Sequence, residues 1–317
     1  MSETLKAKFK RAKNNVINKI KDKGYDILLS KFDRLTSEIE VVYPENFAEK
    51  IRHGFNAETQ TGTNTNLPLI LTNHLSHADS FPLAPVTKKV TESLAGQLEG
   101  FIIPAANTLI GNKQSPYITR VYEGLAHTMK TIYHLEARFY MRKKDGTSFN
   151  RDALEPILRA NEQGYGVAAF YEGVVEGGRT GEDGKMKGMQ PVGEANLMSL
   201  VSTLDRPKRG REVLYIPVSF DGTYHAYSPD KKYPSLKEVV GLMFPSLLAR
   251  RITALVHEPI TTAQMRKLAA EHNIEEADYP KFVSRFISGQ IASVLSPKAQ
   301  GEYGREVAAD YQKLIAA

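Results

Sequence analysis

Residues 67–79 read LPLILTNHLSHAD, an apolar run that passes directly into a polar turn. A short continuous apolar run bounded by turn residues is typical of a strand buried on both faces of a parallel sheet. His74 lies just beyond this run, and Asp79 follows five residues later. Residues five apart lie about 140° apart on a helix and on opposite sides of a strand, so these two side chains can meet only where the chain turns. We therefore expect His74 in a loop after the strand and Asp79 at the start of the next helix.

An imidazole beside a carboxylate indicates acid–base chemistry. A carboxylate that is bonded to one ring nitrogen fixes the tautomer and leaves the other nitrogen as a base, which suits proton removal from a hydroxyl group. The spacing resembles the first motif of the glycerophospholipid acyltransferases, in which four variable residues separate a histidine from an aspartate. The resemblance implies that His74 is the catalytic base and that Asp79 orients it.

Outward from this stretch, strand-like and helix-like segments alternate. The expected strands are 67–71, 100–105, 138–142, 167–171, 213–220 and 252–256. The expected helices are 25–40, 85–98, 116–136, 149–163, 192–204 and most of the C-terminal third, while 56–66 and the Gly-rich segment 172–191 are expected to be loops. This alternation predicts an α/β fold with a mixed, largely parallel central sheet flanked by helices. We expect two units, N-terminal basic amphipathic helices in residues 1–45 and an α/β domain with a helical C-terminal part in residues 46–317.

A second informative segment follows the strand expected at 167–171. Residues 170–181 read FYEGVVEGGRTG. Glycines let backbone N–H groups approach a phosphate closely, and an arginine adds a bidentate charged donor. The alternative is an exposed turn whose glycines only permit tight bends.

The same segment resembles the third acyltransferase motif in the form found in glycerol-3-phosphate acyltransferases, where a glutamate, a glycine and an arginine follow a strand. The resemblance implies that Gly177, Gly178 and Arg179 bind the acceptor. The motif glutamate remains open, because Glu172 lies at the strand end and Glu176 has the right spacing to Arg179.

Two further segments fall in family order. Residues 137–144 read ARFYMRKK and resemble the second motif, which implies that Arg142, with Lys143 beside it, binds the substrate phosphate. Alone, this segment would be a strand with a solvated basic end. Residues 216–218 read IPV and resemble the fourth motif. The four segments together cover roughly the middle half of the chain, from residue 71 to residue 218.

Composition limits the classes of function. The chain has 317 residues, 41% of them hydrophobic, and no cysteine, which removes disulfides, thiolate metal sites and an acyl-cysteine intermediate. No apolar run approaches the length of a transmembrane helix. The net charge of +6 favours acidic partners such as anionic lipid or phosphorylated substrates. Tyr224, Tyr227 and Tyr233 accompany no nucleic-acid-binding motif, so we expect no nucleic-acid partner.

Residues 1–24 carry eight basic side chains and two acidic ones. The net charge of this segment is therefore +6, which equals the net charge of the whole chain. Apolar residues recur along this segment at helical spacing, at Leu5, Phe9, Ala12, Val16 and Ile20. Such a segment either lies on an anionic membrane surface or packs on its own domain with a solvated charged back. Residues 239–256 are also apolar before Arg250 and Arg251; we expect core helix and strand there, with a membrane-dipping edge as the alternative.

The expected function is that of an enzyme of phospholipid biosynthesis that transfers a fatty acyl chain to glycerol 3-phosphate, with lysophosphatidate as the alternative acceptor. The resemblance implies acyl carrier protein or coenzyme A as the thioester donor and no other cofactor. Two alternatives stay open, a lipid or acyl-carrier binding protein of the same fold and a metal-dependent hydrolase that uses His74, His77 and Asp79; we expect no metal. The expected location is the cytoplasm, either free or peripherally bound to the inner face of the membrane.

Overall fold

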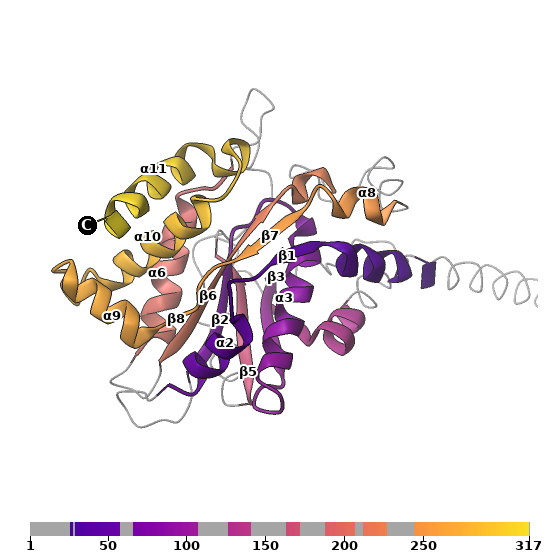
Figure 1. Cartoon of the computed structure of the whole chain (residues 1–317), viewed down its shortest axis with the longest axis horizontal. Helices are drawn as coiled ribbons and strands as arrows, with labels where there is room; N and C mark the ends of the chain where they lie inside the picture. The colour runs from indigo at the N-terminus through magenta and orange to yellow at the C-terminus, as the bar shows by residue number, and fades with distance from the viewer. Residues whose placement is uncertain are drawn as a thin grey trace, which may run out of the picture.

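The computed structural model describes residues 26–27, 29–57, 66–106, 126–140, 163–171, 188–206, 212–226 and 244–316. Within these ranges the chain folds around one mixed, mostly parallel sheet with helices on both of its faces (Figure 1). This architecture confirms the α/β fold class that the alternating segments predict.

The strands are β1 (Glu40–Val42), β2 (Leu67–Thr72), β3 (Gly100–Ala106), β4 (Leu135–Tyr140), β5 (Tyr165–Phe170), β6 (Val213–Asp221), β7 (Thr253–Val256) and β8 (Ile260–Thr261). The helices are α2 (Phe47–Phe55), α3 (Ser80–Ser93), α6 (Val192–Leu204), α8 (Pro245–Ala249), α9 (Thr262–Glu271), α10 (Tyr279–Ala292) and α11 (Pro297–Ala316). Short 3-10 turns form η1 (His77–Asp79) and η4 (Thr223–His225), and residues 29–38 and 126–133 are also helical.

The strands lie in the order β1-β7-β6-β2-β5-β3-β4, and β8 pairs with β6 outside this path. β6, β2, β5, β3 and β4 run in one direction, whereas β7 and β8 are antiparallel to β6. The carboxyl ends of five neighbouring strands therefore meet at one edge of the sheet. In α/β sheets this carboxyl edge is where loops bind ligands.

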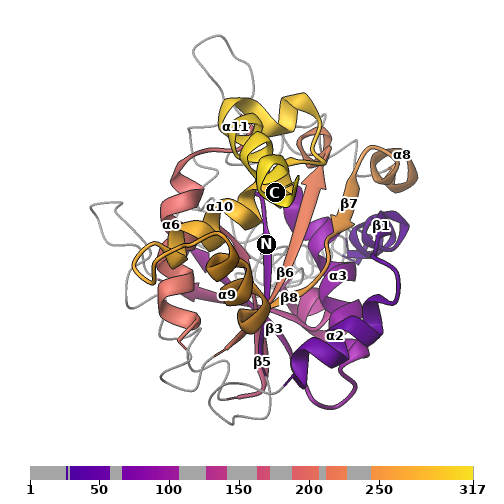
Figure 2. The same ribbon diagram turned by 60° about the vertical axis from the view of Figure 1, so that its left-hand side comes forward.

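The apolar run of β2 lies at the centre of the sheet, and all six of its residues are buried. Its side chains alternate between two cores, as the period of a strand requires. Leu69 and Leu71 belong to the core beneath α6, α9 and α10, whereas Ile70 belongs to the core beneath α2 and α3. Figure 2 shows the two groups of helices on opposite faces of the sheet. Burial on both faces explains why the run shows no polar alternation.

Several predicted elements are confirmed. The strands expected at 67–71, 100–105 and 213–220 are β2, β3 and β6, each within one residue of its predicted ends. The helix expected at 192–204 is α6, with the predicted bounds. The strands expected at 167–171 and 252–256 are β5, which starts two residues earlier, and β7, which starts one residue later.

Two predicted boundaries are wrong for identifiable reasons. α3 begins at Ser80 instead of residue 85, because Ser76 and Asp79 form a capping box that starts the helical turns earlier, and α3 then runs through Pro85. The helix expected to reach residue 136 ends at residue 133, because His134 adopts a left-handed φ of 54°, and β4 starts at Leu135 instead of residue 138.

The sequence did not predict β1 and β8. Both are short, and their pairing depends on β7 and β6, which supply the partner hydrogen bonds. Gln163, at the end of the helix expected at 149–163, lies in a turn, and the rest of that helix, like residues 1–25 and 172–187, lies outside the described residues. Within the described ranges, no helix combines the length and apolar character needed to cross a membrane.

Candidate active site

The structure brings His74 and Asp79 together at the carboxyl edge of the sheet. β2 ends at Thr72, the chain turns, and His74 Nδ1 lies 2.6 Å from Asp79 Oδ2. The Asp79 side chain is completely buried, and the His74 side chain is 12% exposed. Asp79 directly precedes α3, which corresponds to the geometry expected from the five-residue spacing.

Local hydrogen bonds hold the turn between these two residues. Ser76 has extended backbone angles, and its Oγ accepts a bond from the N–H of Ala78 at 3.1 Å. Asp79 Oδ2 in turn accepts bonds from the backbone N–H groups of Leu75, at 2.7 Å, and Ser76, at 3.0 Å. One carboxylate oxygen therefore receives three N–H groups, two of them from rigid backbone.

This arrangement assigns the tautomer of His74. An ionised carboxylate accepts hydrogen bonds and donates none, so Nδ1 of His74 carries the proton that Asp79 receives. In the neutral ring the lone pair is then on Nε2, which can act as a base. Asp79 Oδ1 accepts no hydrogen bond from any described residue.

The ring of His74 is also held by stacking. Its plane lies 18° from that of Phe170, with 4.6 Å between the ring centroids. Phe170 is the last residue of β5 and pairs with Thr72 across the sheet, so the two strands deliver the rings side by side. The sequence analysis missed Phe170, because the adjacency of β2 and β5 cannot be deduced from the sequence of either strand.

Asn73 anchors the base of the turn to the neighbouring strand. Its Oδ1 accepts the N–H of Phe220, and its Nδ2 donates to the carbonyl oxygen of Phe220, both at 2.8 Å. The side-chain amide thus continues the ladder between β2 and β6 beyond the last strand residue. The sequence analysis also missed this residue, because the clamp depends on the adjacency of β2 and β6.

The end of β6 lies beside the turn. Asp221 holds this end by accepting bonds from Gly222 N at 2.7 Å and Ser296 N at 2.8 Å. Gly222 has a φ of +80°, and a Cβ there would lie 1.7 Å from the carbonyl oxygen of Arg251, so only glycine fits. Ala78 of η1 and Ala226 after η4 belong to the same small hydrophobic cluster.

Charged side chains of both signs lie at this end of β6. Lys298 Nζ lies 4.5 Å from the centroid of the Tyr224 ring, which is 4.4 Å from the ring of His225. Burial lowers the pKa of His225, the positive charges of Lys298 and Arg251 lower it further, and the negative charge of Asp221 raises it. The end of β6 therefore carries cations together with a carboxylate.

The other predicted site residues lie outside the described residues. These are Arg142, Lys143, Glu172, Glu176, Gly177, Gly178 and Arg179. The described chain nevertheless reaches the carboxyl edge just before each of these segments, because β4 ends at Tyr140 and β5 at Phe170. Both strands run parallel to β2 within the sheet.

In the part of the chain that the structure describes, no group of three or more His, Cys, Asp or Glu side chains lies in a position to hold a metal ion. His74 and Asp79 supply two candidate ligands, and they bond each other. The side chain of His77 lies outside the described positions.

A buried serine–histidine pair on β6 and after β7 has a structural role. Ser219 Oγ donates to the carbonyl oxygen of Ile291 at 2.8 Å, so it accepts from His257 Nε2 at 2.7 Å. Burial lowers the pKa of His257 to about 4, which keeps the ring neutral. Since the hydroxyl proton is committed to a backbone carbonyl, this pair joins α10 to the sheet and is not arranged as a nucleophile and its base.

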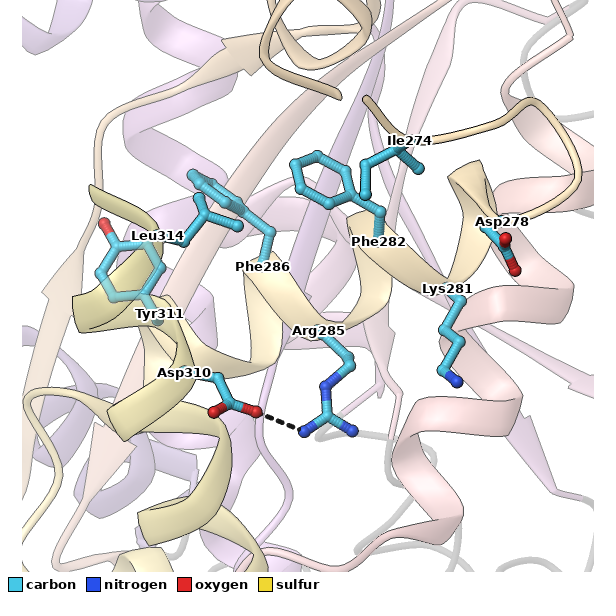
Figure 3. Close-up of a pocket in the computed structure, with 9 residues that line it drawn as sticks. All are labelled: Ile274, Asp278, Lys281, Phe282, Arg285, Phe286, Asp310, Tyr311 and Leu314. Carbon is cyan, nitrogen blue, oxygen red and sulfur yellow. Dashed lines mark hydrogen bonds and ion pairs between the residues drawn. The ribbon is translucent and has the colours of Figure 1, made fainter. Parts of the chain in front are cut away.

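A groove of about 370 Å³ lies between α10 and α11 (Figure 3). Phe282, Phe286 and Tyr311 form its aromatic surface, and the ion pair between Arg285 and Asp310, at 2.7 Å, crosses its rim. The groove follows the first part of α10, whereas Ile291 near the end of that helix bonds to β6. Neither His74 nor Asp79 lines it, so the groove is separate from the candidate site.

Comparisons of the chain with protein-family models, with curated proteins and with solved structures found no match. The resemblance to the acyltransferase motifs therefore depends on the residues themselves.

Proposed function

We propose that the chain is an acyltransferase that moves a fatty acyl chain from a thioester to the hydroxyl group of glycerol 3-phosphate, a step of phospholipid biosynthesis. The observation that carries the proposal is the His74–Asp79 pair, fixed by backbone hydrogen bonds at the carboxyl edge of a parallel sheet. The motif resemblance supplies the substrate class.

In the proposed reaction Nε2 of His74 takes the proton of the acceptor hydroxyl as its oxygen attacks the thioester carbonyl. Asp79 stabilises the imidazolium that forms and keeps the ring oriented through Nδ1. When the tetrahedral intermediate collapses, the carbon–sulfur bond breaks and the thiolate receives the proton from His74. The acyl group passes directly to the acceptor oxygen, so no covalent enzyme intermediate is required.

The acceptor phosphate requires cationic and N–H donors close to this pair. Lys298 and Arg251 lie around the end of β6 beside Asp221 and are candidate cations there. By resemblance, Arg142 with Lys143, and Arg179 with the backbone of Gly177 and Gly178, bind the phosphate directly.

The test is an acyl-transfer assay with purified full-length chain. Acyl-coenzyme A and acyl-carrier-protein donors are each combined with glycerol 3-phosphate and with lysophosphatidate, and the acylated product is measured. We expect transfer to glycerol 3-phosphate, and replacement of His74 by alanine should lower its rate on the order of a hundredfold or more.

His53→Ala is a matched control for this assay, because His53 is exposed on α2 and should leave the rate unchanged. Transfer to lysophosphatidate alone would change the proposed acceptor and leave the proposed acyl-transfer reaction as it stands. The absence of transfer with all four pairs would contradict the proposal, and binding of acyl donor without turnover would instead indicate a lipid or acyl-carrier binding protein.

The acceptor-binding residues can be tested in the same assay. Arg142→Ala and Arg179→Ala should raise the Michaelis constant of the acceptor and leave that of the donor near the wild-type value. Comparing Glu172→Gln with Glu176→Gln identifies the motif glutamate. Equal effects on both substrates would place the two arginines elsewhere.

The net charge of residues 1–24 supports an anionic membrane surface as a further partner. Deleting this segment should reduce sedimentation with anionic vesicles and leave transfer to soluble acceptor largely unchanged. A selective loss of activity with the carrier-protein donor would instead assign the segment to carrier docking.

A further inference from the structure

The carboxylate of Asp79 is hydrogen-bonded through one of its two oxygens. Oδ2 accepts three hydrogen bonds, whereas Oδ1 is equally buried and accepts none from any described residue. An ionised carboxylate can accept hydrogen bonds on both oxygens, and a buried oxygen that stays unpaired destabilises the fold. The side chain that orients His74 therefore still requires a donor at Oδ1.

Thr223 carries a complementary group. It is the first residue of η4 and is completely buried, and its Oγ1 also has no hydrogen-bond partner among the described residues. A hydroxyl group donates one hydrogen bond and can accept others, so it can pair with a group that lacks a donor. Nearly all buried polar groups are bonded to protein or to ordered water, which makes this hydroxyl group an exception that requires an explanation.

Asp79 and Thr223 belong to two short turns that adjoin. Asp79 ends η1, Thr223 begins η4, and the two turns contact each other. The chain segments that lead into them are also joined, because the amide of Asn73 bonds both the N–H and the carbonyl oxygen of Phe220. The fold therefore brings a buried hydroxyl group without a partner next to the turn that contains a buried carboxylate oxygen without a partner.

Hydrogen bonds on both sides of Thr223 hold its backbone in place. Before it, Gly222 has a φ of 80°, and its N–H donates to Asp221 Oδ1 at 2.7 Å. After it, the N–H of His225 donates to the carbonyl oxygen of Gly222 at 2.9 Å, and the N–H of Ala226 donates to that of Thr223 at 3.0 Å. Thr223 is therefore fixed beside η1.

We propose that Thr223 is a positioning residue whose hydroxyl group is joined to Asp79 Oδ1 through one buried water molecule. No direct bond joins the two oxygens, and buried water commonly links polar groups that have no other partner. The water donates to Oδ1 and bonds the Thr223 hydroxyl group, so both buried oxygens are satisfied. With Oδ1 held in this way, Oδ2 stays directed at Nδ1 of His74. The effect on catalysis rests on the proposed acyl transfer, whereas the link itself does not.

The first test is urea unfolding of a Thr223→Val variant of the full-length chain. Valine keeps the shape of threonine and removes its hydroxyl group. If the hydroxyl group takes part in the link, its removal leaves Asp79 Oδ1 poorly satisfied, and the urea midpoint should fall by roughly 0.3 M. If the hydroxyl group has no partner, its removal should leave the midpoint unchanged or raise it, because an unsatisfied buried group is then gone.

The same substitution in an Asp79→Ala background isolates the link. Without the carboxylate, Thr223→Val should no longer lower the urea midpoint. Thr91→Val is the matched control, since Thr91 is another buried threonine whose hydroxyl group has no partner among the described residues. It lies on α3 about 18 Å along the helix from Asp79, so its substitution should not lower the midpoint in either background.

The acyl-transfer assay tests the positioning role. Thr223→Val should lower kcat about tenfold and leave the Michaelis constants of both substrates near their wild-type values, because the change acts on the orientation of His74 and not on binding. Thr223→Ser keeps the hydroxyl group and should restore most of kcat. A role in folding alone would not separate kcat from the Michaelis constants in this way.

An unchanged or higher urea midpoint in Thr223→Val would overturn the link, and so would an equal fall in the Asp79→Ala background. A wild-type kcat in Thr223→Val would overturn the positioning role. If the wild-type chain transfers no acyl group, the proposed function fails, while the unfolding measurements still decide the link. Should a variant fail to fold, a high-resolution crystal structure of the wild-type chain decides. We expect a water bonded to both Thr223 Oγ1 and Asp79 Oδ1, and a different partner for either oxygen would overturn the link.

Discussion

Asp79 and Asp205 are both buried carboxylates, and they differ in how the fold holds them. Asp79 Oδ2 accepts hydrogen bonds from His74, Leu75 and Ser76, all within five residues. Asp205 Oδ2 accepts bonds from the hydroxyl groups of Tyr215 at 2.6 Å and Tyr279 at 2.8 Å, which come from β6 and α10. In each residue Oδ1 accepts nothing from the part of the chain that is described.

Asp205 is surrounded by groups that join helices to the sheet. Burial raises its pKa, although the bonds from Tyr215 and Tyr279 act in the opposite direction. Burial also raises the pKa values of both tyrosines, and the charge of Asp205 raises them further. Arg266 lies over the Tyr279 ring, 4.2 Å from its centroid. This cluster fastens α6, α9 and α10 to the sheet.

The comparison shows that two equally buried carboxylates can have different roles. The local bonds of Asp79 fix one imidazole at the carboxyl edge of the sheet, whereas the long-range bonds of Asp205 fix whole helices. Substitutions at Asp79 should therefore alter chemistry, and substitutions at Asp205 that remove the acceptor oxygen should alter stability.

The largest contrast should come from the same change at both positions. Asp79→Asn should lower the acyl-transfer rate on the order of a hundredfold or more, because an amide favours the wrong tautomer of His74. Asp205→Asn should leave the rate unchanged and the free energy of unfolding within about 1 kcal/mol, because its oxygen still accepts both tyrosine bonds. Steady-state kinetics and urea unfolding measure the two effects.

Equal loss of activity in both variants would erase the distinction between a site carboxylate and a structural one. Near-wild-type activity of Asp79→Asn would show that His74 does not depend on this partner.

Removing the carboxylate of Asp205 should have the next largest effect. Asp205→Ala leaves the hydroxyl groups of Tyr215 and Tyr279 buried without their acceptor, and we expect a loss of about 3 kcal/mol in the free energy of unfolding. A Tyr279→Phe variant is the control, since it removes one of the two donors and should cost less. No loss of stability in Asp205→Ala would mean that packing alone holds the C-terminal helices.

His257 should make the wild-type chain sensitive to acid. The folded chain keeps the ring neutral down to a pKa of about 4, whereas the unfolded chain binds a proton near pH 6.5. Stability is therefore complete above this range and falls as the pH drops through it, by about 2 kcal/mol at pH 5. Unfolding of His257→Gln by urea between pH 7 and pH 5 should lack this part of the slope. An identical slope in both chains would assign the acid sensitivity to other groups.

The smallest effect should come from the cap of the turn. Ser76→Ala removes the bond from Ala78 N to Ser76 Oγ and should cost about 1 kcal/mol of unfolding free energy. Because the two backbone bonds to Asp79 remain, the transfer rate should fall far less than in Asp79→Asn. Thermal unfolding together with the transfer assay measures both quantities. A loss as large as that of Asp79→Asn would make Ser76 part of the catalytic arrangement.

The sequence predicted the features whose causes are local. The meeting of His74 and Asp79 follows from their spacing and from the apolar run before them, and the α/β class follows from the alternation of segments. The stacking of Phe170 on His74 and the clamp between Asn73 and Phe220 depend on strand order, which no local pattern encodes. Likewise, Leu247 of α8 could be recognised as exposed only once the burial of Leu248 and Ala249 was known.

The hydrogen bonds to Asp79 Oδ2 imply an unusual pattern of mutational tolerance. Two of the three donors are backbone N–H groups. The bonds to the carboxylate therefore depend on the length of the turn and not on the chemical identity of most side chains within it. A library of substitutions at the intervening positions should therefore retain many functional members. Insertion or deletion of one residue between His74 and Asp79 should leave almost none, because every donor would be displaced from the oxygen at once.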